Sequence, residues 1–180
     1  MFKPDAHTAH GAKRGRMIKI GLRGPMLMGL LLLALALPIH AAAADQVSLR
    51  AVESGTFQLL GLCDTGGLVL DVTGTGYATH VGNYSSHSRE CFDPATGVVT
   101  GGSFTLTAAN GDIIFGTYSG RVAPTGDLNV LAYDDPGVIT GGTGRFAGAV
   151  GIVTQRGLAN LATGEYEGIL AGSVSSPGPA

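Results

Sequence analysis

Residues 138–149 read VITGGTGRFAGA, a glycine-rich turn that joins two runs of β-forming residues and ends in a phenylalanine among small residues. Val, Ile and Thr favour strands, and clusters of glycine interrupt them. The same alternation of short β-type runs and turns continues on both sides of this stretch, and no helical periodicity persists after residue 45. The stretch and its surroundings therefore indicate an all-β domain.

Eight β-type runs recur every 8 to 15 residues or so, separated by Gly, Asn, Asp and Pro. Asn110-Gly111 predicts a two-residue type I′ hairpin loop, and residues 134–137, which read DDPG, predict a further turn. Eight antiparallel strands at this spacing predict one small closed β-barrel. The predicted strands are residues 55–60, 68–75, 82–92, 98–109, 112–122, 128–133, 147–156 and 165–174.

The hairpin at Asn110-Gly111 predicts which side chains share a face of the barrel wall. With a two-residue loop, Leu106 lies opposite Phe115, and one face of the hairpin becomes apolar while the other, with Tyr118, is polar. We expect the apolar face to point into the lumen. Similar alternation at Leu68, Leu70 and Val72, and at Leu128, Val130 and Ala132, predicts further inward positions. The expected ligand-contacting residues are Phe104, Leu106, Ile113, Phe115 and Leu70.

The interior of an eight-stranded barrel is either filled by its own side chains or holds one small ligand. Both alternatives fit the sequence. Many glycines fall inside the predicted strands, where they weaken pairing unless a bend or a close approach requires them. We expect them to mark bends of the barrel, with space for a ligand as the alternative.

The predicted strand at residues 82–92 has no apolar face. Its simplest interpretation is a wet rim or a loop, and the alternative is a polar stripe inside the lumen, which would need partners, water or a ligand. A histidine beside a carboxylate is a common proton-transfer pair. The candidate catalytic residues, if the protein is an enzyme, are His87, Arg89, Glu90 and Tyr84 on this strand and His80 and Asp71 on the preceding segment.

Residues 1–44 combine a basic segment, an apolar run at residues 26–37 and four alanines at residues 41–44. The apolar run has about a dozen residues against the ~20 of a membrane-spanning helix, so we predict a cleaved signal peptide, with an uncleaved anchor as the alternative. Its start is either Met1 or Met17. We expect a secreted or periplasmic domain at residues 45–174 and a disordered tail at residues 175–180. Because export exposes thiols to an oxidising compartment, Cys63 and Cys91 are predicted to form a disulfide.

The chain beyond residue 44 carries five arginines, no lysine and twelve acidic residues, a net charge of −7. It therefore lacks the cationic surface that nucleic acids and anionic membranes require, and we expect neither as a partner after signal cleavage. His80 and His87 lack the i, i+4 spacing of zinc ligands, so we expect no metal site. No nucleotide-binding motif stands in a suitable strand and helix context, and no cofactor is expected.

The GGTGRF sequence at residues 141–146 resembles the motif of the dirigent and allene oxide cyclase barrel families. Residues 103–112, SFTLTAANGD, and 116–120, GTYSG, look like bacterial secreted proteins of that superfamily. The resemblance implies an eight-stranded barrel, a homo-oligomer such as a trimer or dimer, and cyclase or dirigent chemistry in some members. Many dirigent proteins read Ala-Arg-Gly after the motif, whereas this chain reads Ala149-Val150-Gly151.

Within the motif we expect a structural role for five residues. Glycines at a bulged turn commonly supply positive φ angles, and a phenylalanine among small residues suits a plug of the core. These residues are Gly141, Gly142, Gly144, Arg145 and Phe146.

Three functions follow as hypotheses. The first is a secreted, non-catalytic barrel that binds a small apolar molecule or a partner protein. The second is a cyclase or isomerase that uses polar groups in the lumen. The third is a filled barrel with a structural role in the cell envelope.

Overall fold

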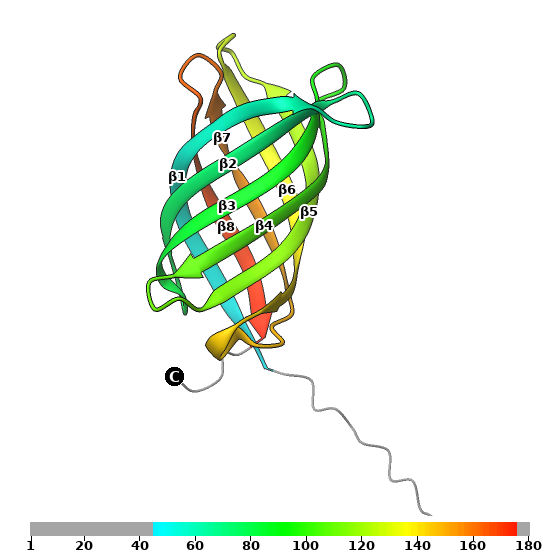
Figure 1. Ribbon diagram of the computed structural model, residues 1–180. Coiled ribbons are helices and arrows are strands. Elements are labelled where there is room, and N and C mark those ends of the chain that lie inside the picture. The colour runs from blue at the N-terminus through cyan, green and yellow to red at the C-terminus, as the bar shows by residue number, and fades with distance from the viewer. Residues whose placement is uncertain (1–44, 176–180) are drawn as a thin grey trace, which may run out of the picture. The chain divides into compact units, whose positions relative to one another are not determined.

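The computed structural model describes residues 45–175, which form one closed barrel of eight antiparallel strands. Each strand pairs with the next along the chain, and β8 pairs with β1, so the sheet has no free edge (Figure 1). The predicted fold class is therefore confirmed. The strands are β1 (Gln46–Leu62), β2 (Leu68–Ala78), β3 (Gly82–Asp93), β4 (Val98–Ala108), β5 (Ile113–Pro124), β6 (Val130–Gly142), β7 (Gly151–Asn160) and β8 (Glu165–Ser175).

The predicted signal peptide at residues 1–44 and nearly all of the predicted tail lie outside the described residues. Ser175, the first residue of that tail, is instead buried at the end of β8. Within residues 45–175, no helix is long and apolar enough to span a membrane.

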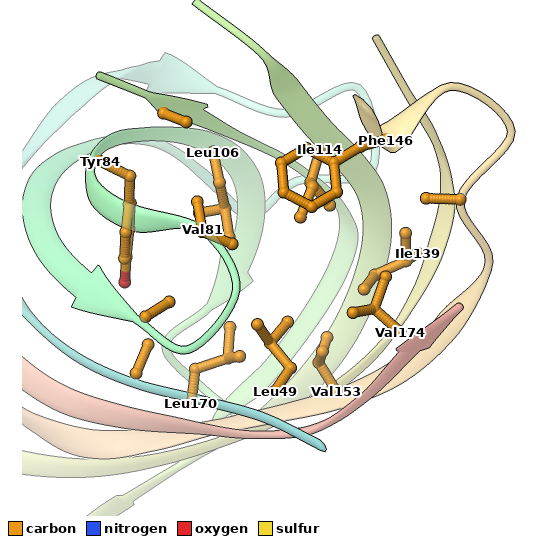
Figure 2. Packing of buried hydrophobic residues seen from close by; sticks show 14 residues of the cluster. Leu49, Val81, Tyr84, Leu106, Ile114, Ile139, Phe146, Val153, Leu170 and Val174 are labelled. Carbon is orange, nitrogen blue, oxygen red and sulfur yellow. The ribbon is translucent and has the colours of Figure 1, made fainter. Parts of the chain in front are cut away.

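An apolar core fills one end of the barrel, where β1 begins and β8 ends (Figure 2). The β2–β3, β4–β5 and β6–β7 connections lie at this end, and the short 3₁₀ helix η1 (Gly144–Phe146) lies in the last of them (Figure 1). We call it the closed end. The largest fully buried side chains there are those of Phe146, Leu49, Ile114 and Val174.

The residues of the GGTGRF motif build this closed end. Phe146 is 1% exposed, and the guanidinium carbon of Arg145 lies 4.9 Å from the centre of its ring. Arg145 also pairs with Asp112 at 3.4 Å and donates a hydrogen bond to the carbonyl oxygen of Val81 at 3.1 Å. The expected structural role of Phe146 and Arg145 is therefore supported by their contacts.

The glycines of the motif act in two different ways. Gly144 has a φ of 57°, as expected for a turn glycine. Gly141 and Gly142 do not have positive φ angles, which corrects the prediction for these two. They are needed for space, because a Cβ atom would collide with the ring of Phe115 at Gly141 and with the backbone of Phe146 at Gly142.

The β4–β5 hairpin differs from the predicted type I′ turn. The N–H of Gly111 donates to the carbonyl of Ala108 at 2.9 Å, and the N–H of Ala108 donates to the carbonyl of Asp112 at 2.8 Å. Gly111 has a φ of 86°, so the loop has three residues and ends in a left-handed glycine.

This extra loop residue shifts the β4–β5 register by one position. Leu106 lies opposite Ile114 instead of Phe115. Because strand side chains alternate between faces, the shift turns Ile113 and Phe115 outward and brings Ile114 and Tyr118 inward. The predicted lumenal positions of Ile113 and Phe115 are therefore wrong.

The predicted turn at residues 134–137 is also wrong, because these residues lie inside β6. Proline lacks the N–H that a central strand normally donates. Here the β5–β6 pairing passes from Tyr118–Gly137 to Arg121–Asp134 and leaves Pro136 out on that side.

The side chains of β6 that face inward are also the opposite set from the predicted one. Leu131, Tyr133 and Asp135 line the interior, in place of Val130 and Ala132. Leu128 precedes the strand and is 96% exposed.

Cys63 and Cys91 form a disulfide with a Cα–Cα distance of 6.0 Å. It connects the β1–β2 loop to β3 at the end of the barrel opposite η1, which we call the open end. The predicted pairing is confirmed. At this open end the disulfide ties together two neighbouring parts of the wall.

Candidate functional site

Between the core and the open end, the barrel is hollow. The cavity has a volume of about 350 Å³ and reaches solvent at a rim where Leu59 and Leu161 are 57% and 52% exposed. Its walls are mainly apolar. The apolar lining consists of Phe57, Leu59, Leu68, Leu70, Val72, Phe92, Val122, Leu131, Ala159 and Leu161.

The polar face of β3 forms one wall of this interior. Ser88 and Glu90 line the cavity, and Tyr84 and Ser86 continue the same face toward the closed end. The simplest interpretation of this strand, a wet rim or a loop, is therefore wrong, and the alternative of an inward polar stripe is correct. The hydrogen-bond partners of this stripe lie across the lumen, on Glu53 of β1 and Tyr118 of β5.

Glu53 of β1 anchors the deepest polar cluster and is 8% exposed. Tyr84 donates a hydrogen bond to its Oε2 at 2.7 Å, Ser86 donates to Oε1 at 2.9 Å, and Tyr166 also donates to Oε1. Burial, reinforced by the charge of Glu53, raises the pKa of both Tyr84 and Tyr166, so their hydroxyls remain donors. Three hydroxyl groups thus converge on one buried carboxylate.

Glu90 and Tyr118 form a second polar pair nearer to the open end. The Tyr118 hydroxyl donates to Oε2 of Glu90 at 2.5 Å. Burial raises the pKa of Glu90, and the hydrogen bond from Tyr118 opposes that rise. The Tyr118 ring lies against Gly102 on β4, where a Cβ atom would collide with it. The glycine therefore makes room for a ring inside the lumen.

Asp135 of β6 is the third inward carboxyl group. Burial, followed by the negative charges of Glu90 and Asp134, raises the pKa of Asp135 to about 7. Its Oδ1 atom is buried and has no hydrogen-bond partner. Gly120 on β5 makes room for this carboxyl group, since a Cβ atom there would overlap it. The site therefore contains a carboxyl group that titrates near neutral pH.

The raised pKa of Asp135 predicts a pH-dependent stability. Between about pH 4 and pH 7 the folded chain holds a proton that the unfolded chain has released, so the free energy of unfolding should fall as pH rises through this window, by at most about 1.4 kcal/mol per pH unit. Denaturant unfolding of wild type and Asp135→Asn across this window checks it. The variant should lose most of the decline and keep the part that comes from Glu90, whose pKa burial also raises, whereas the outward-facing control Asp134→Asn should keep most of it. Parallel curves for wild type and Asp135→Asn would refute the assignment.

The candidate catalytic residues fall into separate places. Asp71, His87 and Arg89 form a cluster on the outer face, where Oδ1 of Asp71 lies 2.9 Å from Nε2 of His87 and 3.7 Å from Nε of Arg89. His87 also borders a small inner void, but its side chain is 57% exposed on the outer face. His80 lies in the β2–β3 turn at the closed end. Only Glu90 and Tyr84 point into the lumen.

The candidate ligand-contacting residues are likewise divided. Leu70 lines the main cavity. Phe104 and Leu106 lie deeper, around an inner void of about 40 Å³ that separates the cavity from the core. Ile113 and Phe115 face outward, and Phe115 is 40% exposed.

Sequence reasoning missed several inward polar groups. Glu53 continues the alternation of Val47, Leu49 and Ala51, which is the signal that could have placed it in the lumen. Asp135 was missed because the prediction assigned residues 134–137 to a turn instead of a strand. The remaining missed residues are Tyr118, Tyr133, Gln155 and Tyr166.

No family model matches the chain, and no curated protein matches it either. The resemblance to the dirigent and allene oxide cyclase families therefore stays a prediction. Within residues 45–175, no group of three or more His, Cys, Asp or Glu side chains gathers closely enough to hold a metal ion. The site therefore has to be interpreted from its own shape and chemistry.

Proposed function

We propose that the protein binds a small, largely apolar molecule inside the open half of its barrel. The observation that carries this proposal is the cavity of about 350 Å³. Small-molecule sites commonly have about 300 to 1,000 Å³, apolar walls and a few well-placed polar groups. The apolar walls with Glu90, Asp135 and Tyr133 fit that description. A barrel filled for a structural role would not need this space.

A cyclase or isomerase activity is the second candidate, and Asp135 is the observation that favours it. A carboxyl group with a pKa of about 7 can both accept and donate a proton at neutral pH. It lies in the same cavity as Glu90 and Tyr118. Incubation of the purified protein with an extract of its host, followed by mass spectrometry, separates the two functions, because an enzyme would convert the retained compound.

Export fits the proposal, because a disulfide is stable in the oxidising conditions outside the cytoplasm. The predicted signal peptide leads us to propose that the mature chain begins between Ala42 and Asp45. We also propose a homo-oligomer, as the resemblance implies.

Blocking the cavity should abolish binding. Ala159 lines the cavity, so Ala159→Trp places an indole in the space that a ligand needs. Binding of the neutral probe 1-naphthylmethanol, followed by its fluorescence, should weaken on the order of tenfold or more. Ala123 is an exposed alanine on the outer face of β5, and the control variant Ala123→Trp should bind like wild type. Equal binding by both variants would place the probe elsewhere and refute the proposal.

A further inference from the structure

The charges of the lumen are all of one sign. Glu53, Glu90 and Asp135 point into it from β1, β3 and β6. Residues 45–175 contain no lysine, and the five arginines lie elsewhere. Four of them are exposed, and Arg145 belongs to the closed end, where it pairs with Asp112. The only other basic side chain at the interior wall, His87, has its ring paired with Asp71 on the outer face. The lumen therefore has acidic groups without basic partners.

The three acidic groups differ in how well they are satisfied. Glu53 accepts three hydrogen bonds, and Glu90 accepts one from Tyr118. Asp135 has a buried Oδ1 without a partner. Buried carboxyl groups are normally paired or fully hydrogen-bonded, because leaving them without partners costs free energy. Asp135 is therefore the lumenal group that lacks a partner, and it borders the cavity proposed above to hold a ligand.

A cation bound in the cavity would compensate the negative charges of the lumen. It would supply a donor to Asp135 and offset the repulsion between Asp135 and Glu90. Tyr118 and Tyr133 line the same cavity, and aromatic rings near a positive charge attract it. Beyond this polar zone, toward the open end, the wall becomes apolar at Leu68, Phe92 and Leu131. The cavity thus combines an acidic inner part with an apolar outer part.

We propose that the ligand is an organic cation, an ammonium group on an apolar body, whose charged group lies between Glu90 and Asp135 and whose body contacts the apolar wall. This inference rests on the proposed function, since it names the class of molecule that the cavity binds. An anionic ligand would meet only like charges. A neutral ligand would gain no advantage from the acidic groups beyond hydrogen bonds.

Three probes that share one naphthalene body test the charge preference: 1-naphthylmethylamine, 1-naphthylmethanol and 1-naphthaleneacetate, the anion of 1-naphthaleneacetic acid. Their dissociation constants for the disulfide-bonded protein are measured at pH 8 through naphthalene fluorescence. We expect the amine to bind on the order of tenfold more tightly than the alcohol, and the acetate to bind most weakly, as paired charges at protein interfaces do. Equal affinities for amine and alcohol, or tighter binding of the acetate, would overturn the cation inference and leave the proposed function standing. Failure of all three probes to bind would overturn both.

Conservative variants identify the carboxyl groups that hold the cation. Asp135→Asn and Glu90→Gln should each lower the affinity for the amine on the order of tenfold and change that for the alcohol by less than about twofold. Asp134→Asn is the matched control, because Asp134 is the neighbouring residue but pairs outside the barrel with Arg156 at 3.0 Å. Unchanged amine affinity in both lumenal variants would overturn the inference.

The pH dependence of the wild-type protein gives an independent test that needs no variant. Asp135 has a pKa of about 7, so it gains its negative charge between about pH 6 and pH 8, whereas a primary amine remains protonated over this range. The other titratable groups facing it are Glu90, Tyr118 and Tyr133. Because burial raises the pKa of both tyrosines, neither ionises in this window. Amine affinity should rise with pH while alcohol affinity stays level, and a flat amine profile would contradict the inference.

Discussion

Replacing Phe146 with alanine should lower the free energy of unfolding by about 3 to 5 kcal/mol. Phe146 is 1% exposed, and its ring packs in the core at the closed end of the barrel (Figure 2). The η1 turn that carries it is held by the contacts of Arg145 with Asp112 and Val81, so the backbone has little freedom to fill the resulting space. Denaturant unfolding followed by far-ultraviolet circular dichroism measures the effect, because the chain lacks tryptophan.

Phe115→Ala is the matched control for this prediction. Phe115 is 40% exposed and lies on the outer face against Gly141. Its truncation removes the same atoms from a site that water already reaches, so the loss should be about 1 kcal/mol or less. Similar losses for the two variants would contradict the observed register of β4 and β5. A larger loss for Phe115→Ala would favour the two-residue hairpin instead.

Glu53→Ala should have a comparably large effect, about 3 to 5 kcal/mol. The change removes the common acceptor of three hydroxyl groups and leaves those of Tyr84 and Tyr166 buried without their partner. Each buried donor left without an acceptor costs about 1 to 3 kcal/mol. The difference in the free energy of unfolding between variant and wild type, at constant denaturant slope, reports this cost.

Two further variants define the origin of that loss. Glu53→Gln keeps one acceptor oxygen and the shape of the side chain, and it should recover part of the stability. Glu167, an exposed residue of β8, provides the surface control, and Glu167→Ala should change stability by less than about 0.5 kcal/mol. If Glu53→Ala were as mild as Glu167→Ala, the buried cluster would not exist as described.

The barrel itself follows from the sequence, because its signals are local. Each of the eight predicted strands overlaps an observed one, and six of them agree within four residues at both ends, since β-branched runs and turn residues specify them locally. The predicted disulfide also exists. Strand lengths were less accurate. β1 begins at Gln46, whereas the prediction began at residue 55. The inward alternation starts at Val47, but the charged Glu53 interrupts its apolar pattern in the sequence.

The candidate site was harder to predict, because it depends on which way each side chain faces. One additional loop residue, Ala109, turns Phe115 outward and Tyr118 inward. Asp135 was placed in a turn by the prediction, since Pro136 between two acidic residues and a glycine is typical of a turn. Pro136 fits inside the strand because the β5–β6 pairing has a gap there, and the carboxyl group of Asp135 fits in the lumen because Gly120 has no side chain. These are contacts between strands, and a single sequence does not display them.

The sequence did not decide between a filled and a hollow barrel, because the lumen is filled at one end and hollow at the other. At the closed end, the inward positions hold Leu49, Ile114 and Phe146, which fill the space. Toward the open end, the inward positions include polar groups that need partners and apolar groups that surround a cavity. The filled half contains the apolar core, and the hollow half contains the proposed site.

The central claim is that this hollow half binds a small molecule, and a crystal structure of the protein with 1-naphthylmethylamine tests it most directly. The account predicts the naphthalene ring between Leu70, Phe92 and Leu131, with the ammonium nitrogen within hydrogen-bond distance of Asp135 or Glu90. A lumen filled by its own side chains, or a probe found only on the outer face, would contradict the claim.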